Sequence, residues 1–192
     1  MKTKIIISII FQMLIAISVF SQKDTSGIYF TSDDFVNQRL SYAINCKTQK
    51  HRISADLIFR DKIVSVKHND TVYTFQQDSV YAARYCDNSI VRFSNHQQYP
   101  LLNPDETILI YKVVSGSGHK VSPVVTKYFF SNGAKDGIRE LTLHNIKKSF
   151  PDNHKFHNLL DMQFKSDDEL AEYDFYHKCY KINQILKTSL EQ

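Results

Sequence analysis

The sequence predicts an α+β protein in which an antiparallel sheet is followed by C-terminal helices. Short segments rich in Ile, Val, Tyr and Phe, separated by turn residues, fill the chain from about residue 27 to residue 141. From 142 to 189, apolar residues recur at helical spacing, which predicts about three helices. Parallel strands need long crossovers, and no long helical pattern separates the predicted strands. We therefore expect a meander of about eight to ten strands, as an open sheet or a partial barrel.

Residues 1–21 have the pattern of a secretory signal peptide. Lys2 and Lys4 precede an uncharged apolar run, Ile5–Phe20, and Ser21 places a small residue before a cut at Gln22. The run is shorter than the roughly 20 apolar residues of a membrane span, so we expect cleavage instead of anchoring. No Cys lies at 18–25, so a lipid-modified terminus is not expected. The sequence predicts export, to the periplasm or the exterior.

The length and net charge of residues 22–192 limit the types of protein that this part of the chain can form. Residues 22–192 fit a single α+β domain, and we see no linker, no repeat and no second apolar stretch of spanning length. The chain has 24 Lys and Arg, two of them in the leader, against 20 Asp and Glu, so the remainder has a net charge of about +2. This near-neutral balance gives no electrostatic reason to expect a nucleic-acid partner. We expect no cofactor.

Three cysteines remain in a chain that we expect to be exported: Cys46, Cys86 and Cys179. Cys46 and Cys86 both lie near predicted strand ends, and they are our candidate disulfide. Closing a loop of that length stabilises by about 4 kcal/mol on the chain-entropy model. Cys179 falls on a predicted helix face, where a free thiol packs as a small apolar group.

The predicted strands follow one another as hairpins. Alternation over Ile53–Arg60 gives a strand with one more apolar face. Asn69 and Asp70 tolerate left-handed backbone angles, which predicts a two-residue turn. Cys86–Ser89 form the next turn. The segments flanking these turns and following them are Ile63–Lys67, Val72–Gln76, Val80–Tyr85, Ile90–Phe93, Gln98–Leu102, Thr107–Val114 and Val124–Phe130.

The loop Ser115–His119 separates the last two of these strands. Ser117 lies between two glycines and His119 is close to it, which invites comparison with a nucleophile and its base. A catalytic nucleophile needs a base held in place by a third group, and the G-x-S-x-G spacing is absent. A loop that only connects two strands is the favoured interpretation.

Three helix starts are predicted in the C-terminal part. Thr142 caps a first helix that ends at Pro151, and Asp152 caps a second. Ser166–Glu169 has the pattern of a capping box and would open the longest helix, reaching about Ser189. Its apolar face would comprise Ala171, Phe175, Cys179, Ile182 and Leu186.

Two strings of the chain resemble a group of uncharacterised exported proteins from Bacteroidota. They are Gly27–Phe35, with the sequence GIYFTSDDF, and Phe150–His157, with the sequence FPDNHKFH. The ending Phe-Ser-Gln of the leader is also similar to that group. The resemblance implies a Gram-negative cell envelope or exterior, and it carries no activity and no site residues.

His154, His157 and Asp161 are the candidate metal ligands. On one helix they fall at i, i+3 and i+7, so all three can project from one side. Imidazole nitrogen and carboxylate oxygen suit zinc or a similar metal, with His144 or His177 as a further ligand. The alternative, which we favour, is a capped helix whose histidines lie on its solvated face. The signature His-Glu-x-x-His of a metalloprotease helix is absent.

Three hypotheses about function remain open at this point. The first is a non-enzymatic envelope protein that binds a small ligand or a partner protein, through a concave face or through strand addition at a sheet edge. The second is a metal-dependent hydrolase that uses His154, His157 and Asp161. The third is a structural or assembly component of an envelope complex.

Overall fold

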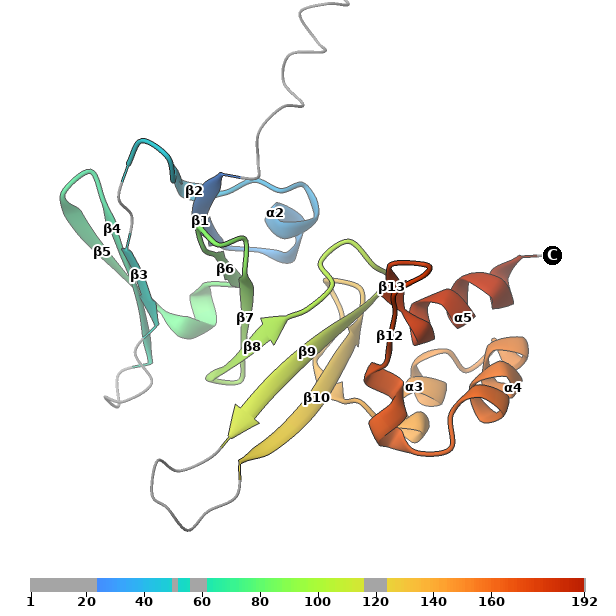
Figure 1. The fold of residues 1–192 in the computed structure, drawn as a ribbon. Helices are drawn as coiled ribbons and strands as arrows, with labels where there is room; N and C mark the ends of the chain where they lie inside the picture. The colour runs from blue at the N-terminus through green and yellow to red at the C-terminus, as the bar shows by residue number, and fades with distance from the viewer. Residues whose placement is uncertain (1–23, 50–51, 56–61, 116–123, 192) are drawn as a thin grey trace, which may run out of the picture.

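The computed structural model describes residues 24–49, 52–55, 62–115 and 124–191. Its main element is an eight-stranded antiparallel sheet with the order β11-β10-β9-β8-β7-β6-β1-β2, and this sheet is not closed into a barrel (Figure 1). Helices follow the strands along the chain. The α+β class with a large antiparallel sheet is therefore confirmed, in the form of an open sheet.

Two smaller sheets accompany the large one, with the orders β3-β4-β5 and β12-β13. The strands are β1 Thr25–Tyr29, β2 Ser41–Asn45, β3 Arg52–Ala55, β4 Ile63–His68, β5 Thr71–Gln76, β6 Ala82–Arg84, β7 Ile90–Ser94, β8 Gln97–Leu101, β9 Ile108–Ser115, β10 Val125–Asn132, β11 Arg139–Glu140, β12 Tyr173–Asp174 and β13 Cys179–Tyr180. The helices are α2 Ser32–Val36, α3 Leu143–Ser149, α4 His154–Gln163 and α5 Lys181–Leu190, with short 3₁₀ helices η2 Gln77–Ser79 and η3 Asp167–Ala171.

One face of the large sheet packs against two separate layers. At the β1–β6–β7 end, Ile28, Ala83 and Phe93 pack against Val64 and Val66 of the three-stranded sheet. At the β9–β10 end, the same face packs on the C-terminal helices, and Figure 1 shows the two layers at opposite ends of the sheet. The buried residues of this second layer are Ile108, Ile110, Phe130, Leu141, Ile146, Phe156, Leu160, Phe164, Leu170, Ile182 and Leu186.

The opposite face of the large sheet is covered more thinly. Its apolar cluster includes Tyr29, Tyr99 and Tyr111, and the short helix α2 contributes Phe35 to it. The rings of Tyr29 and Phe35 meet edge to face with centroids 5.5 Å apart. A helix of five residues covers little area, so much of this face depends on loops for its cover.

Arg92 of β7 is buried on this second face, with 8% of its surface exposed. Its Nη1 donates to Tyr111 Oη at 2.9 Å and to Ser131 Oγ at 3.1 Å, and its Nη2 donates to the Asp136 carbonyl at 2.8 Å. The guanidinium also lies 4.7 Å from the centroid of the Tyr81 ring. One side chain thus joins β7, β9, β10 and the segment that follows β10.

The predicted hairpins are present. Asn69 and Asp70 have φ angles of 48° and 60° and link β4 to β5, as expected for a type I′ turn. The turn Cys86–Ser89 joins β6 to β7. Of the predicted strand Ile53–Arg60, the structure describes the part up to Ala55, and the loop proposed around Ser117 and His119 lies outside the described residues.

Gly27 has a specific structural role in the pairing of β1 with β2. The register between these strands shifts between Ser26 and Ile28, as at a β-bulge. A Cβ at Gly27 would lie 2.8 Å from the Ser41 carbonyl oxygen and 3.1 Å from the Leu40 Cβ. Only glycine therefore permits this close approach of the two strands.

Of the predicted helix caps, the one at Thr142 is present, and the ones at Asp152 and Ser166 are not. The Thr142 hydroxyl accepts the Asn145 N–H at the start of α3, as predicted. Helix α4 is capped by Asn153, whose side chain accepts the Phe156 N–H at 2.9 Å, and not by Asp152, which lies in the preceding turn. Thr31 and Asp34 form a complete capping box for α2.

The predicted long helix from Ser166 to about Ser189 is wrong. The segment instead forms η3, the small hairpin β12–β13 and α5. The Asp174 carboxylate accepts the N–H groups of Tyr176 and His177, which stabilises a turn where the helix would have to continue. Phe175 points into solvent with 84% exposure, and Cys179 lies half-buried on β13, so neither contributes to a helix face.

Cys46 and Cys86 form a disulfide in the structure, with an S–S distance of 2.06 Å, and Cys179 is free. The bond links the residue after β2 to the β6–β7 turn. The predicted leader, residues 1–21, lies outside the described residues. Within the described ranges, no helix has the length and apolar character needed to cross a membrane.

Replacing Arg92 with Met is expected to lower the free energy of unfolding by about 3 kcal/mol, because hydrogen bonds from a charged donor to buried partners are lost. Chemical denaturation measures the change. Arg39→Met is the control, because Arg39 makes an exposed ion pair with Asp34 and its loss costs at most about 1 kcal/mol. Equal effects of the two substitutions would contradict the structural role of Arg92.

Removing the disulfide with the double variant Cys46→Ser and Cys86→Ser is expected to cost about 4 kcal/mol of unfolding free energy, because the bond closes a loop with a sequence separation of 40. Denaturation of this variant, with Cys179→Ser as the control, measures the effect. A stability unchanged by loss of the pair would show that the bond does not restrict the unfolded chain.

Candidate functional site

A cavity of about 590 Å³ lies on the thinly covered face of the large sheet. Its size falls in the range of small-molecule sites, which is about 300 to 1,000 Å³. Strands β1, β6, β7 and β9, helix α2 and four connecting segments form its walls: the residues after α2, the β6–β7 turn, the loop before β9 and the turn after β10. The lining residues are Tyr29, Phe35, Val36, Gln38, Arg84, Asn88, Ile90, Pro104, Asp105, Glu106, Thr107, Leu109, Gly133 and Ala134.

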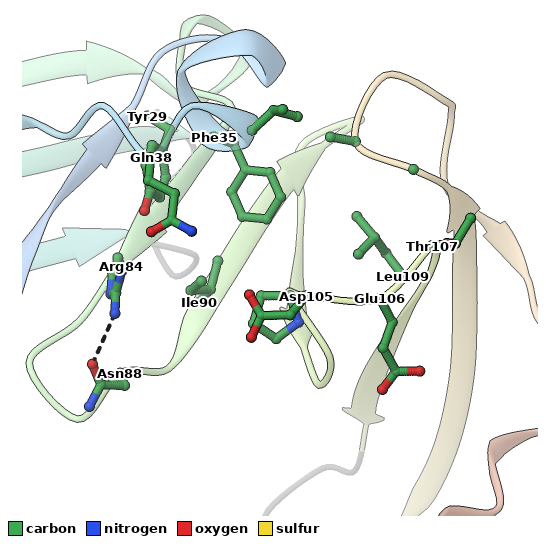
Figure 2. A pocket seen from close by; sticks show the side chains of 14 residues that line it. Tyr29, Phe35, Gln38, Arg84, Asn88, Ile90, Asp105, Glu106, Thr107 and Leu109 are labelled. Carbon is green, nitrogen blue, oxygen red and sulfur yellow. Dashed lines mark hydrogen bonds between the residues drawn. The ribbon is translucent and has the colours of Figure 1, made fainter. Parts of the chain in front are cut away.

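The floor of this pocket is apolar. Phe35, Ile90 and Leu109 are all buried members of the same hydrophobic cluster. They come from α2, β7 and β9, and Figure 2 shows them between the polar groups of the two sides. A ligand with an apolar body would therefore displace water from apolar side chains, which is favourable.

Arg84 forms the positive side of the pocket. It ends β6 and lies on the same sheet face as Tyr29 and Ile90, because Gly27, Arg84 and Ile90 are paired across β1, β6 and β7. Its Nη2 donates to Asn88 Oδ1 at 3.2 Å (Figure 2). Its Nε is buried without a hydrogen-bond acceptor among the residues that the structure describes. The more exposed terminal nitrogens of Arg84 are the donors suited to an anionic or carbonyl group of a ligand.

The disulfide supports this side of the site. Cys86 follows Arg84 by two residues, and the bond to Cys46 anchors the turn that carries Asn88. Within that turn, Asp87 accepts the N–H and the hydroxyl of Ser89, which holds the pKa of Asp87 below its usual range. The turn that carries Asn88 is therefore held both by the disulfide at Cys86 and by the hydrogen bonds between Asp87 and Ser89.

Tyr29 lies beside the Arg84 guanidinium at the edge of the floor. Burial raises the pKa of Tyr29, and the hydrogen bond and positive charge of Arg84 offset part of that rise. Tyr29 therefore stays a neutral phenol near pH 7 and offers a hydroxyl to the pocket.

Asp105 and Glu106 form the negative side, in the loop before β9. This loop is held by Asn103, whose side chain donates to the Ile108 carbonyl at 2.8 Å and accepts the Ile110 N–H at 2.6 Å. Asn103 thus makes, with the main chain of Ile108 and Ile110, the kind of hydrogen bonds that a neighbouring strand would make with β9. Glu106 Oε2 accepts the Tyr180 N–H at 3.3 Å, and Asp105 is exposed at the rim.

Desolvation of Glu106 raises the pKa of its carboxyl group, and hydrogen bonds from Asn103, Tyr180 and Asn183 lower it by less. The loop is fixed from the helix side as well, because Asn183 of α5 accepts the Ile108 N–H at 2.8 Å. The negative side of the pocket is thus attached to the C-terminal helices.

The remaining wall is the turn after β10. Gly133 has a φ of 74°, a conformation that favours glycine, and its N–H donates to the Thr107 carbonyl at 2.9 Å. The Ala134 carbonyl accepts the Tyr81 hydroxyl at 2.8 Å, and the neighbouring Asp136 carbonyl accepts Arg92. The buried Arg92 network therefore positions this wall.

The predicted metal ligands do not line this pocket, and the polar groups of His157 and Asp161 have other partners. His157 Nε2 is 2.8 Å from the Phe150 carbonyl and 3.2 Å from the Lys147 carbonyl. Asp161 pairs with Lys147 at 2.5 Å. Across the described ranges, no group of three or more His, Cys, Asp or Glu side chains is arranged to hold a metal ion. The site at His154, His157 and Asp161 stays a prediction.

The further ligands considered for that site lie elsewhere. His144 is exposed on α3, and His177 Nδ1 is 2.7 Å from Asp174 Oδ2 in the β12–β13 hairpin. The sequence interpretation did not select any lining residue of the pocket. Arg84 carried a signal, since it is the charged residue of the otherwise uncharged predicted strand Val80–Tyr85.

No family model, no curated protein and no solved structure matches the chain. The resemblance to exported Bacteroidota proteins therefore stays a prediction.

Replacing Glu106 with Gln is expected to change how stability depends on pH. Because the pKa of folded Glu106 is raised above 4.5, the folded state holds this proton more tightly than the unfolded state does. The glutamate contribution to the unfolding free energy therefore decreases as the pH rises from the unfolded-state pKa of about 4.5 through the raised pKa of the folded state. Across that window the Glu106→Gln variant should gain stability relative to the native protein. Unfolding curves at several pH values measure this, and a constant difference between the two proteins would contradict it.

Proposed function

We propose that this protein is a binding domain that holds a small zwitterionic ligand in the pocket between α2 and the loop before β9. The ligand class is a free amino acid or short peptide with an apolar side chain. The observation that carries the proposal is the cavity itself, which has an apolar floor and is bordered by Arg84 and Asn88 on one side and by Asp105 on the other.

The two ends of the pocket differ in charge, so we expect a ligand that carries both a negative and a positive group. Arg84 and Asn88 offer donors for a carboxylate, and Arg gives a planar fork that matches a carboxylate in geometry. Asp105 offers an acceptor for an ammonium group on the other side, whereas the Glu106 carboxylate points away from Arg84 (Figure 2) and accepts the Tyr180 N–H. A simple anion would meet the Asp105 carboxylate, whereas a zwitterion satisfies both ends.

The lining chemistry supports binding in preference to hydrolysis. The lining residues include no Ser, Cys or His, which are the usual nucleophiles and bases of acyl transfer. Gln38, Asn88 and Thr107 instead supply neutral polar groups that can orient a ligand.

Export is part of the proposal. The apolar leader, the small-residue cut before Gln22 and the Cys46–Cys86 bond all suit an oxidising compartment outside the cytoplasm. A binding domain there would meet the amino acids and peptides of the surroundings.

The test is calorimetric titration of the purified protein with dileucine. Two blocked forms of dileucine test the two charged ends of the pocket separately: N-acetyl-dileucine lacks the ammonium group, and dileucine amide lacks the carboxylate. We expect dileucine to bind and both blocked forms to bind more weakly. Arg84→Gln should weaken dileucine binding by about 10- to 100-fold, because it removes a hydrogen bond from a charged donor to the ligand carboxylate.

The matched control is Arg39→Gln, which makes the same chemical change at an exposed ion pair that does not line the pocket. It should bind dileucine as the native protein does. If no probe binds, or if Arg84→Gln binds as tightly as the control, the proposed function is wrong.

A further inference from the structure

We propose that the outer edge of β5 is a dimerisation surface, on which β5 of a second copy of this chain adds in antiparallel orientation. The two three-stranded sheets would join into one sheet of six strands. The inference is independent of the pocket, which lies on the other face of the large sheet.

The edge of β5 is open and carries no charge. Among the described strands, β5 pairs only with β4. Its sequence from Thr71 to Gln76 is TVYTFQ, with no charged residue and no proline. Val72 is 60% exposed and Tyr73 is 36% exposed. Natural edge strands are usually protected by charges, prolines or bulges, and β5 has none of these devices.

The turn of the hairpin determines which backbone groups face outward. In a two-residue hairpin, the residues that flank the turn form a hydrogen-bonded pair, here His68 and Thr71. Hydrogen-bonded and non-bonded pairs alternate along the strands, so Tyr73 and Phe75 also bond to β4. The main-chain groups of Val72, Thr74 and Gln76 therefore point away from β4.

These outward groups fix the register of a symmetric dimer. A two-fold axis perpendicular to the sheet at Thr74 pairs Thr74 with Thr74 of the second copy, and Val72 with Gln76. The Gln76 carbonyl already accepts the Ser79 hydroxyl at 2.7 Å, so we count its N–H alone. About four main-chain hydrogen bonds result, two at Thr74 and one at each flanking pair.

The same register pairs aromatic side chains on the inner side of the sheet. Tyr73 of one copy faces Phe75 of the other, in a non-hydrogen-bonded pair where side chains approach closely. In the single chain these rings already pack on Tyr42, with centroids 4.7 Å and 5.5 Å away. The dimer would extend this aromatic cluster across the interface.

The flanking charges do not oppose the dimer strongly. Asp70 pairs with Lys67 at 3.4 Å, and Asp78 Oδ1 lies 3.1 Å from His96 Nδ1. Two six-residue strands bury less area than a standard stable interface, so we expect a weak dimer with a dissociation constant in the micromolar range or above.

Sedimentation equilibrium of the purified protein from about 5 to 500 µM tests the proposal. We expect a monomer–dimer equilibrium, and Thr74→Lys should raise its dissociation constant at least about tenfold by placing two like charges at the axis. Ser65→Lys is the matched control, because Ser65 pairs with Thr74 across the hairpin but lies one strand inside the edge. It should dimerise as the native protein does.

Thermal melting verifies that each variant is folded, and a cross-link tests the register. In a Cys179→Ser background, Thr74→Cys should form an intermolecular disulfide on mild oxidation, and Val72→Cys should form much less, because Val72 faces Gln76 instead of itself. A protein that stays monomeric at every concentration would overturn the proposal. A dimer unaffected by Thr74→Lys, or one cross-linked more by Val72→Cys than by Thr74→Cys, would also overturn it.

Discussion

A buried guanidinium fixes the arrangement of this molecule. Arg92 has no carboxylate partner among the described residues, so its charge is compensated by the Tyr111 and Ser131 hydroxyls, the Asp136 carbonyl and the Tyr81 ring. These groups come from four segments of the chain, and each must be in place for the charge to be buried at an acceptable free energy. The turn after β10 is held by this network and forms one wall of the pocket, so the shape of the pocket depends on a residue that does not line it.

The pocket exists because the two faces of the sheet are covered unequally. One face carries two thick layers, the three-stranded sheet and the C-terminal helices. The other has only the five-residue helix α2 and loops, which leave a hollow of about 590 Å³ between them. Its two charged sides are attached to different supports: the Cys46–Cys86 bond holds the Arg84 side, and Asn103 with Asn183 holds the loop of Glu106. Such separate supports keep opposite charges apart across an apolar floor, as the proposed zwitterionic ligand requires.

The features that were predicted correctly from the sequence depend on residues that lie close together along the chain. The turn at Asn69–Asp70, the Thr142 cap and the strand-then-helix order are all local patterns, and the structure confirms them. The helix expected from Ser166 is wrong because the Asp174 side chain stabilises a turn that helical periodicity does not reveal. The pocket was missed because it assembles Phe35, Arg84 and Glu106 from distant segments, and the burial of Arg84 Nε depends on tertiary packing. Charged residues within apolar strands, at Arg84 and Arg92, were the available signal.

The most direct test of this account is the hydrogen exchange of arginine Nε–H groups, measured by nuclear magnetic resonance on the ¹⁵N-labelled protein. The account predicts that Arg92 exchanges far more slowly than the exposed Arg39, because its Nε is buried and its terminal nitrogens donate to the network. It predicts in addition that dileucine shifts the Arg84 signal and leaves that of Arg92 nearly unchanged. Exchange of Arg92 as fast as that of Arg39 would contradict the buried guanidinium on which the sheet and the pocket wall depend.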